Sequence, residues 1–74
     1  MYIVMEIQTN AEGQVATLIN QYEEINNAES KFHQILASAS ISEVPVHTAV
    51  LMTEKGVTVR AEYYDHGQNS SPAM

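Results

Sequence analysis

The chain has 74 residues, no cysteine, nine acidic residues against three basic ones, and a formal net charge of −6. This composition excludes disulfide bonds within the chain. It also disfavours general binding to nucleic acid or anionic membranes, because neutralising phosphate needs clustered Lys and Arg. A single core in so short a chain is marginal, so oligomerisation is the expected additional support. The acidity fits solubility best, and mimicry of nucleic-acid charge is a weaker alternative because the acidic residues are scattered.

No targeting segment is recognisable. No apolar run approaches the ~18 residues that a membrane-spanning helix requires. The N-terminal stretch MYIVMEIQ lacks the basic start and the long apolar centre of a signal peptide. We therefore expect a protein without a membrane partner that stays where it is made, and the absence of cysteine fits a reducing cytoplasm.

The first predicted elements are two strands joined by a tight turn. Residues 2–9 alternate in the manner of a strand. The segment from Asn10 to Gly13 predicts a three-residue hairpin loop with a bulge at Gly13, since Asn favours the first position of a turn and Gly accepts positive φ. A second strand of about residues 14–23 then returns antiparallel. The register that this loop implies pairs Thr9 with Val15, Ile7 with Thr17, and Met5 with Ile19.

The stretch from Asn26 to Ser40 is the only convincing helix, because its apolar residues fall at helical spacing. These residues are Ala28, Phe32, Ile35, Leu36 and Ala39. Asn26 is the expected N-cap, and Glu29 three residues later completes a capping-box-like pair. The helix is expected to end near residues 40–42, and Pro45 prevents its extension.

A second hairpin follows the helix. Residues 46–53 form the clearest strand, Lys55-Gly56 fits a two-residue turn, and residues 57–65 return antiparallel. Pairing Glu54 with Val57 places Met52 opposite Val59, Val50 opposite Ala61, Thr48 opposite Tyr63, Leu51 opposite Arg60, Ala49 opposite Glu62 and His47 opposite Tyr64. Residues 1–66 are then one domain, and residues 67–74, which lack periodicity, are expected to be a disordered tail.

The predicted fold class is α+β, with element order ββαββ and one helix packed on one face of a four-stranded, mainly antiparallel sheet. The face expected beneath the helix comprises Ile3, Met5, Ile7, Val15, Ile19, Val46, Val50, Met52, Val59, Ala61 and Tyr63. The opposite face carries Tyr2, Val4, Leu18, Tyr22, Ala49, Leu51 and Tyr64. This face is too apolar to be fully exposed to water. The homo-oligomer interface is therefore expected either on this face, at Tyr2, Val4, Leu18, Tyr22, Leu51 and Tyr64, or at an edge of the sheet. The alternative is a monomer whose aromatic and β-branched residues are simply good strand formers.

The residues that could carry chemistry form no recognised catalytic or metal pattern. His33, His47 and His66 lack zinc-ligand spacing and no cysteine accompanies them, so surface or interface roles are expected. The alternative is a metal site in which a carboxylate joins the histidines across the fold, for instance Glu62 near His47. Because the sequence also lacks a nucleophile elbow, a phosphate loop and a dinucleotide fingerprint, we expect no catalytic residue, no metal, no cofactor and no enzyme activity.

Arg60 is the only arginine, and it lies mid-strand among apolar residues. A guanidinium group there fits a clamp for a phosphate or carboxylate, with His47, Tyr64 and His33 as further ligand- or partner-binding residues. The alternative is an ion pair with Glu62 or Glu6, or a salt bridge at an interface.

Three segments carry a resemblance: EIQTNAEG, YEEINNAESKFHQILASASIS and VPVHTAVLMTEKGVTVRAEYYDH. Over residues 1–66 the chain resembles a group of small uncharacterised proteins encoded by phages and prophages of Firmicutes. The resemblance implies a viral origin and expression in a bacterial cytoplasm, and it transfers no functional residue.

A phage domain of this size without catalytic groups commonly works by binding. The predicted function is therefore a non-enzymatic, homo-oligomeric binding protein that counters host defence. It would do so by inhibiting a host protein or by sequestering a small nucleotide signal. The alternative is an accessory protein of virion assembly.

Overall fold

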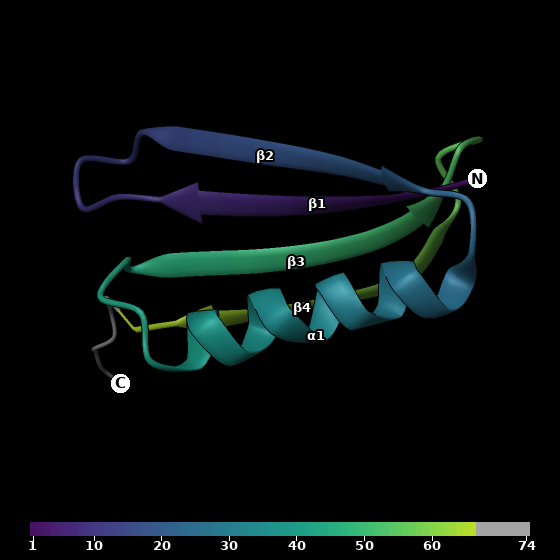
Figure 1. Cartoon of the computed structure of the whole chain (residues 1–74). Coiled ribbons are helices and arrows are strands. Elements are labelled where there is room, and N and C mark those ends of the chain that lie inside the picture. The colour runs from purple at the N-terminus through teal and green to yellow at the C-terminus, as the bar shows by residue number, and fades with distance from the viewer. Residues whose placement is uncertain (67–74) are drawn as a thin grey trace.

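A computed structural model describes residues 1–66 as an antiparallel sheet of four strands with one helix, which confirms the predicted α+β fold (Figure 1). The elements are β1 (Tyr2–Thr9), β2 (Val15–Tyr22), α1 (Ile25–Ser40), β3 (Val46–Thr53) and β4 (Thr58–Asp65). The strand order in the sheet is β2-β1-β3-β4, so β1 and β3 are central and β2 and β4 are the edges. The tail expected for residues 67–74 lies outside the described residues.

The β1–β2 hairpin has the loop and the register that the sequence predicts. The Asn10 N–H donates to the Gln14 carbonyl at 2.9 Å, and the Gly13 N–H donates to the Asn10 carbonyl at 3.0 Å. Gly13 adopts a φ of +84°, a conformation that glycine enters without steric cost. The Asn10 side-chain oxygen also accepts hydrogen bonds from the N–H groups of Glu12 and Gln14, both at 2.9 Å, and so fixes the turn.

The turn of the β3–β4 hairpin is one residue longer than predicted. The Thr53 N–H donates to the Val57 carbonyl and the Gly56 N–H donates to the Thr53 carbonyl, both at 2.9 Å. These bonds make a three-residue loop of the same kind as the first, with Gly56 at a φ of +85°. The predicted two-residue turn at Lys55-Gly56 is therefore wrong.

A bulge next to this turn restores the predicted register. Met52 pairs with Thr58 instead of Val59, and the shift lies between Leu51 and Met52. The bulge inserts one extra residue into β4, which offsets the extra residue of the loop. Every predicted pair beyond the bulge is therefore confirmed: Leu51 with Arg60, Val50 with Ala61, Ala49 with Glu62, Thr48 with Tyr63 and His47 with Tyr64.

The helix begins earlier than predicted. Ile25 is its first residue and Glu24 its N-cap, without a side-chain capping bond, so capping by Asn26 is wrong. Ile25 is partly buried and packs against the core. Burying part of an isoleucine contributes a free energy comparable to the roughly 1 kcal/mol of a capping hydrogen bond, so packing of Ile25 offsets the missing cap. The helix ends at Ser40, as predicted.

The helix covers the opposite face of the sheet from the one predicted. The core consists of Val4, Ala28, Phe32, Ile35, Ala49 and Leu51. Both faces are apolar, so alternation alone does not choose between them. The face around Ala49 admits the helix closely, because alanine at this position and at Ala28 adds little height between the two layers.

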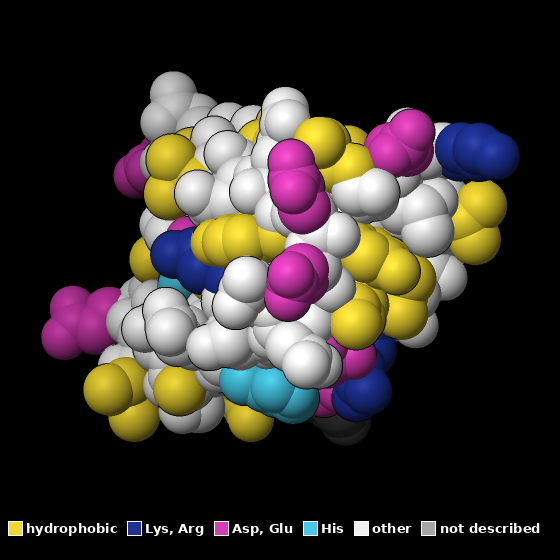
Figure 2. All heavy atoms as spheres, turned by 45° about the vertical axis from the view of Figure 1, so that its right-hand side comes forward, with side chains coloured by type: hydrophobic (Ala, Val, Ile, Leu, Met, Phe, Trp, Pro, Cys, Tyr) yellow, Lys and Arg dark blue, Asp and Glu magenta, His cyan; other side chains and the backbone are white. Residues whose placement is uncertain are grey.

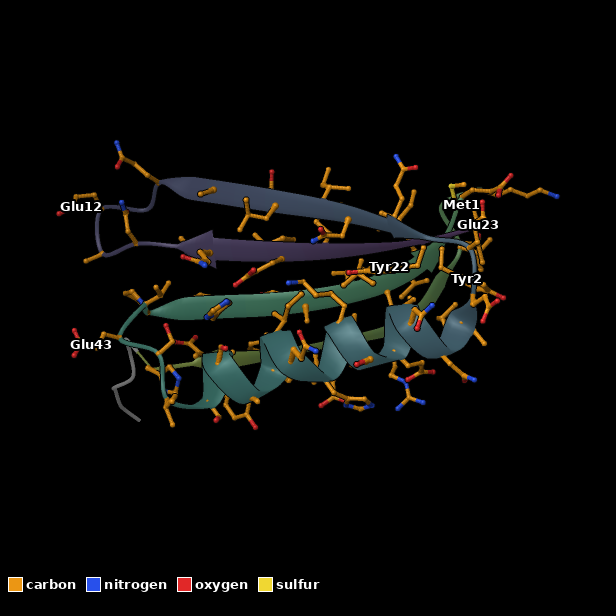
Figure 3. The ribbon with its side chains drawn as sticks, in the orientation of Figure 1. Met1, Tyr2, Glu12, Tyr22, Glu23 and Glu43 are labelled. Carbon is orange, nitrogen blue, oxygen red and sulfur yellow. The ribbon has the colours of Figure 1, made fainter. Side chains whose placement is uncertain are left out.

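The predicted oligomer interface is wrong for the residues that the helix buries. Val4 and Leu51 are both 0% exposed beneath it and cannot contact a second copy. Tyr2 and Tyr22 are partly buried against the margin of the core, near the start of the helix (Figure 3). Leu18 and Tyr64 are the two predicted interface residues that remain exposed.

Candidate functional site

The uncovered face of the sheet, called the open face from here on, is the most distinctive surface of the molecule. Its paired apolar members are Ile3, Met5, Ile7, Val15, Ile19, Val46, Val50, Met52, Ala61 and Tyr63, and Val59 lies at the bulge of β4 and is 46% exposed. Val15, Ile19 and Tyr63 are 62%, 59% and 66% exposed. These are the residues that the sequence analysis placed beneath the helix.

The strand registers arrange this face in cross-strand rows. One row runs from edge to edge and is entirely apolar: Ile19, Met5, Val50 and Ala61. Asp65 is the only acidic residue at a strand position of the open face, and it lies at the end of β4. All other acidic side chains of the chain belong to the helix side, the helix or the loops; Glu12, Glu23 and Glu43 lie at the ends of the molecule (Figure 3).

The size of the open face is that of an interface. Four strands of eight residues, about 4.8 Å apart with about 3.3 Å per residue, span roughly 19 by 26 Å, or about 500 Å². This outline, which also includes threonine and glutamine positions, is comparable to the largest apolar patch of a typical soluble monomer, and such patches are often functional. The open face therefore qualifies as a docking surface for a partner of comparable area.

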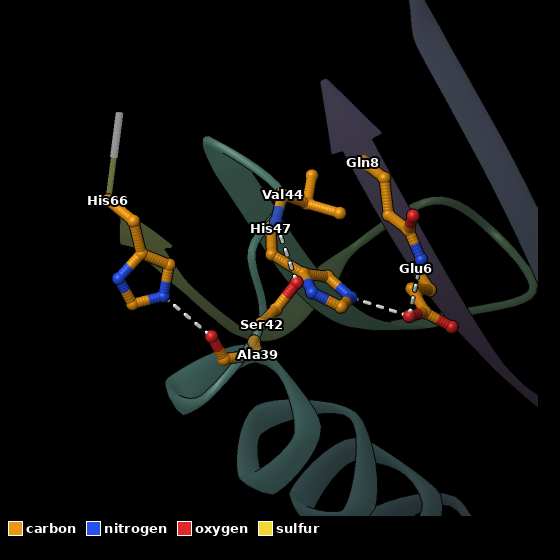
Figure 4. Close-up of polar contacts among 7 residues, drawn as sticks. All are labelled: Glu6, Gln8, Ala39, Ser42, Val44, His47 and His66. Carbon is orange, nitrogen blue, oxygen red and sulfur yellow. Dashed lines mark hydrogen bonds and ion pairs between the residues drawn. The ribbon is translucent and has the colours of Figure 1, made fainter. Parts of the chain in front are cut away.

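A second candidate is a polar pair beneath the helix. The His47 Nε2 lies 2.5 Å from the Glu6 Oε2, and the Gln8 amide donates to the same oxygen at 3.0 Å (Figure 4). Burial raises the pKa of Glu6. The hydrogen bonds from His47 and Gln8 and the charges of His47 and Lys31 outweigh this effect, so the pKa of Glu6 is lowered overall. His47 is only 3% exposed, and within residues 1–66 its Nδ1 has no hydrogen-bond partner. The pair joins the central strands β1 and β3 and is closed to a ligand.

Arg60 pairs with the helix. Its guanidinium lies 3.5 Å from the Glu29 Oε2, and the His33 Nε2 lies 3.6 Å from the Glu29 Oε1. The partner is thus neither Glu62 nor Glu6, the two carboxylates considered from the sequence. With Arg60 about half exposed, the contact is a surface ion pair worth at most about 1 kcal/mol.

The four predicted ligand-binding residues fall into two groups. Arg60 and His33 meet through Glu29, whereas His47 pairs with Tyr64 across the strands, four residues further along β4. Four strand residues span about 13 Å. The ring of Tyr64 stacks on that of His66, with centroids 5.8 Å apart, and the His66 Nε2 lies 2.7 Å from the Ala39 carbonyl oxygen. His66, which stacks on Tyr64 of the second group, therefore connects the end of β4 to the end of the helix.

Two clefts lie at opposite ends of the sheet. One, of about 520 Å³, is lined by Gln8, Asn10, Gln14, Val15, Ala16 and Val44. The other, of about 380 Å³, is lined by Met1, Tyr2, Thr53, Glu54, Lys55 and Val57. Neither of these two clefts is lined by Arg60, His33, His47 or Tyr64, the residues of the predicted clamp.

The remaining surface shows no concentrated charge on the side that Figure 2 presents. Acidic and basic side chains are scattered there between hydrophobic patches (Figure 2). Among residues 1–66, no group of three or more His, Asp and Glu side chains could hold a metal ion. No helix in the same range is long and apolar enough to cross a membrane.

Sequence reasoning missed both the Glu6–His47 pair and the exposed state of the open face. The pair depends on β1 lying beside β3, where Gln8 faces His47. That adjacency joins segments about forty residues apart, and no turn or periodicity signals it. The open face was recognised as one apolar set, but its exposure depends on which side the helix packs.

Comparison with known proteins assigns the chain to no family. No protein-family model matches the chain, and no curated protein or solved structure shows significant similarity to it.

Proposed function

We propose that this chain is a non-enzymatic binding protein that works as a homo-oligomer, and that the open face is the surface through which two copies meet. The observation that carries this proposal is the uncharged row of Ile19, Met5, Val50 and Ala61, which crosses the whole sheet on its exposed side. Burying such a row removes apolar surface from water at no cost for desolvating a charge.

Charge favours a second copy as the occupant. A chain with a net charge of −6 repels its own copies unless its charges lie away from the contact. The open face meets this condition, because Asp65 at its margin is the only acidic or basic residue at its strand positions. A basic partner would instead meet the acidic residues of the helix and the loops.

The area also fits. Two facing sheets of about 500 Å² each would bury about 1,000 Å², the lower bound of a specific interface. Sheets that pack face to face lie about 10 Å apart and nearly aligned, with interdigitated side chains. The product is a β-sandwich with one helix on each outer surface, and it supplies the second apolar layer that the small core of each copy lacks.

The test places a charge in the centre of the row. The Val50→Lys variant should stay folded, because its side chain points away from the helix-covered core, but its dimers should dissociate at least 100-fold more readily. Ile41→Lys is the matched control, because Ile41 is 84% exposed and lies outside the sheet. The mass is measured by analytical ultracentrifugation over a dilution series, with circular dichroism as the check on folding. A monomeric wild type, or a Val50→Lys variant with the wild-type mass, would overturn the proposal.

The biological role that we propose is counter-defence in a bacterial host, and the resemblance to phage proteins is its support. Of the two modes, inhibition of a host protein is favoured over nucleotide sequestration. Arg60 already bonds to Glu29, and His47 is closed beneath the helix, so a nucleotide would find no assembled clamp in these residues. The helix and the acidic loops stay accessible in the face-to-face dimer and can meet a host protein.

A further inference from the structure

The two edges of the sheet are built differently. Edge strands are usually protected against pairing with other chains by charged residues, proline or bulges. In β4 the protection consists of Arg60, Glu62, Asp65 and the bulge opposite Leu51 and Met52. In β2 the sequence VATLINQY contains no charge and no proline, and it pairs with β1 residue by residue without irregularity.

The same strand is bare on both of its faces. Ile19 on the open face is 59% exposed, and so is Leu18 on the side of the helix. The helix lies toward the other edge of the sheet and leaves residues 15–19 of β2 exposed (Figure 1). An uncharged strand that is exposed in this way along one edge is suited to pairing with another strand.

The hydrogen-bond pattern shows which backbone groups of β2 are free. In an antiparallel pair, residues that exchange hydrogen bonds alternate with residues that do not. The bond from the Asn10 N–H to the Gln14 carbonyl sets this alternation, so the even-numbered residues of β2 direct their N–H and C=O groups at β1. The odd-numbered residues direct theirs at the free edge. They are Val15, Thr17, Ile19 and Gln21.

We propose that β2 of one copy pairs antiparallel with β2 of a second copy, across a two-fold axis that passes through Leu18. This register pairs Val15 with the partner's Gln21 and Thr17 with the partner's Ile19. Every residue whose N–H and C=O groups point to the free edge then has a hydrogen-bonding partner. An axis through Thr17 or through Ile19 would leave one outward residue in each copy opposite a position beyond β2.

The pairing produces a continuous antiparallel sheet with both helices on the same side. The two Leu18 side chains face each other in a pair without hydrogen bonds, where Cα atoms are about 4.5 Å apart, and they cover each other. The open faces join into one surface of twice the area. The edge contact is additional to the face contact of the proposed function, and the two together predict a tetramer.

Charge exchange at position 18 tests the axis. Leu18→Lys and Leu18→Glu each place like charges directly opposite one another, and each should weaken the edge contact at least 10-fold. Mixed in equal amounts they should restore it, because the opposite charges then meet across the axis. The measurement is native mass spectrometry of each variant alone and of the mixture, and recovery of the tetramer in the mixture alone is the expected result. Thr17→Pro is the second variant: it removes only an outward N–H, so it should stay folded and also lose the edge contact.

The outcomes separate the two contacts. We expect a tetramer for the wild type, dimers for Leu18→Lys and for Val50→Lys, and a monomer for the double variant. Wild-type mass for both separate Leu18 variants would overturn the edge pairing and leave the face contact standing. Failure of the mixed Leu18 variants to recover the tetramer would overturn the axis. Wild-type mass for Val50→Lys would overturn the face contact and leave the edge pairing standing.

Discussion

Among individual residues, Glu6 and His47 show how this small core tolerates a buried polar contact. Both side chains lie on central strands beneath the helix, with the Glu6 side chain 15% and that of His47 4% exposed. A carboxylate in this position is favourable only if hydrogen bonds compensate for its lost hydration. His47 and Gln8 supply them, and the pKa of Glu6 is lowered despite burial.

The acid sensitivity of the protein should therefore depend partly on Glu6. Because its pKa in the folded state lies below the ordinary value of 4.5, this group stabilises the fold above that pH. The contribution is lost as the pH falls from 4.5 through the lowered folded pKa. Glu6→Gln should lower the free energy of unfolding at pH 6 by about 1 kcal/mol, since a charge-assisted hydrogen bond becomes a neutral one. It should also flatten the decline below pH 4.5.

The measurement is urea denaturation from pH 6 to pH 3 at one protein concentration. Glu12→Gln is the control, because it makes the same charge change on an exposed loop. An acid profile of Glu6→Gln that runs parallel to that of the wild type would contradict this account of the pair.

Among the elements, the two hairpins use one turn design. Each loop has three residues, ends in a glycine near φ +85°, and is closed by the same two backbone bonds. In the second hairpin the bulge beside Met52 absorbs the register change that the longer loop introduces. The bulge also protects the β4 edge, whereas β2 has no such feature.

Replacing Gly56 tests the three-residue turn assigned to the second hairpin. No atom lies within 4 Å of a Cβ built there, so Gly56→Ala tests backbone strain without a steric clash. We expect a loss of about 1–2 kcal/mol in the free energy of unfolding, the cost of the left-handed conformation for an L-residue. Gly56→Asn should recover part of it, because Asn tolerates this region better. Equal stability of Gly56→Ala and the wild type in urea denaturation would contradict the assigned turn.

For the molecule as a whole, the charge distribution separates two surfaces. Acidic residues occupy the helix side and the loops, while the open face and the β2 edge are uncharged apart from Asp65. In the proposed assembly, copies associate through the sheet, and the acidic side stays available for another partner. The proposed role as an inhibitor of a host protein depends on that side.

The nucleotide alternative is tested by thermal stability. We expect no rise in the melting temperature with a panel of nucleoside phosphates and cyclic dinucleotides at millimolar concentration. A ligand at 100 times its Kd that binds only the folded state would add about 2.7 kcal/mol. A nucleotide that stabilises the wild type but not Arg60→Ala would show that Arg60 leaves Glu29 to form a clamp, and it would replace the host-protein proposal.

Local chemistry explains which features were predictable. The Asn10-to-Gly13 turn fixes the register of its own hairpin, and alternation groups Ile3, Met5 and Ile7 on one face. An ion pair of Arg60 was only the alternative to a ligand clamp, and Glu29 was not considered as its partner, because Glu29 belongs to an element whose position over the sheet the sequence does not state. The start of the helix was also not predictable from local sequence. Asn26 has a preference for the N-cap position, but the helix begins one residue before it, at Ile25, which packs against the core.

By itself, the sequence determined the five elements, both hairpin registers beyond the turns, and the division of the strands into two apolar faces. These follow from residues close together in the chain and from the two-residue period of a strand. Only the tertiary structure decided that β1 lies beside β3, that Glu6 meets His47, and that the helix covers Val4 and Leu51. With two apolar faces available, the choice depends on how closely one helix fits each of them. That fit is a property of the packed layers, and it is absent from any single segment.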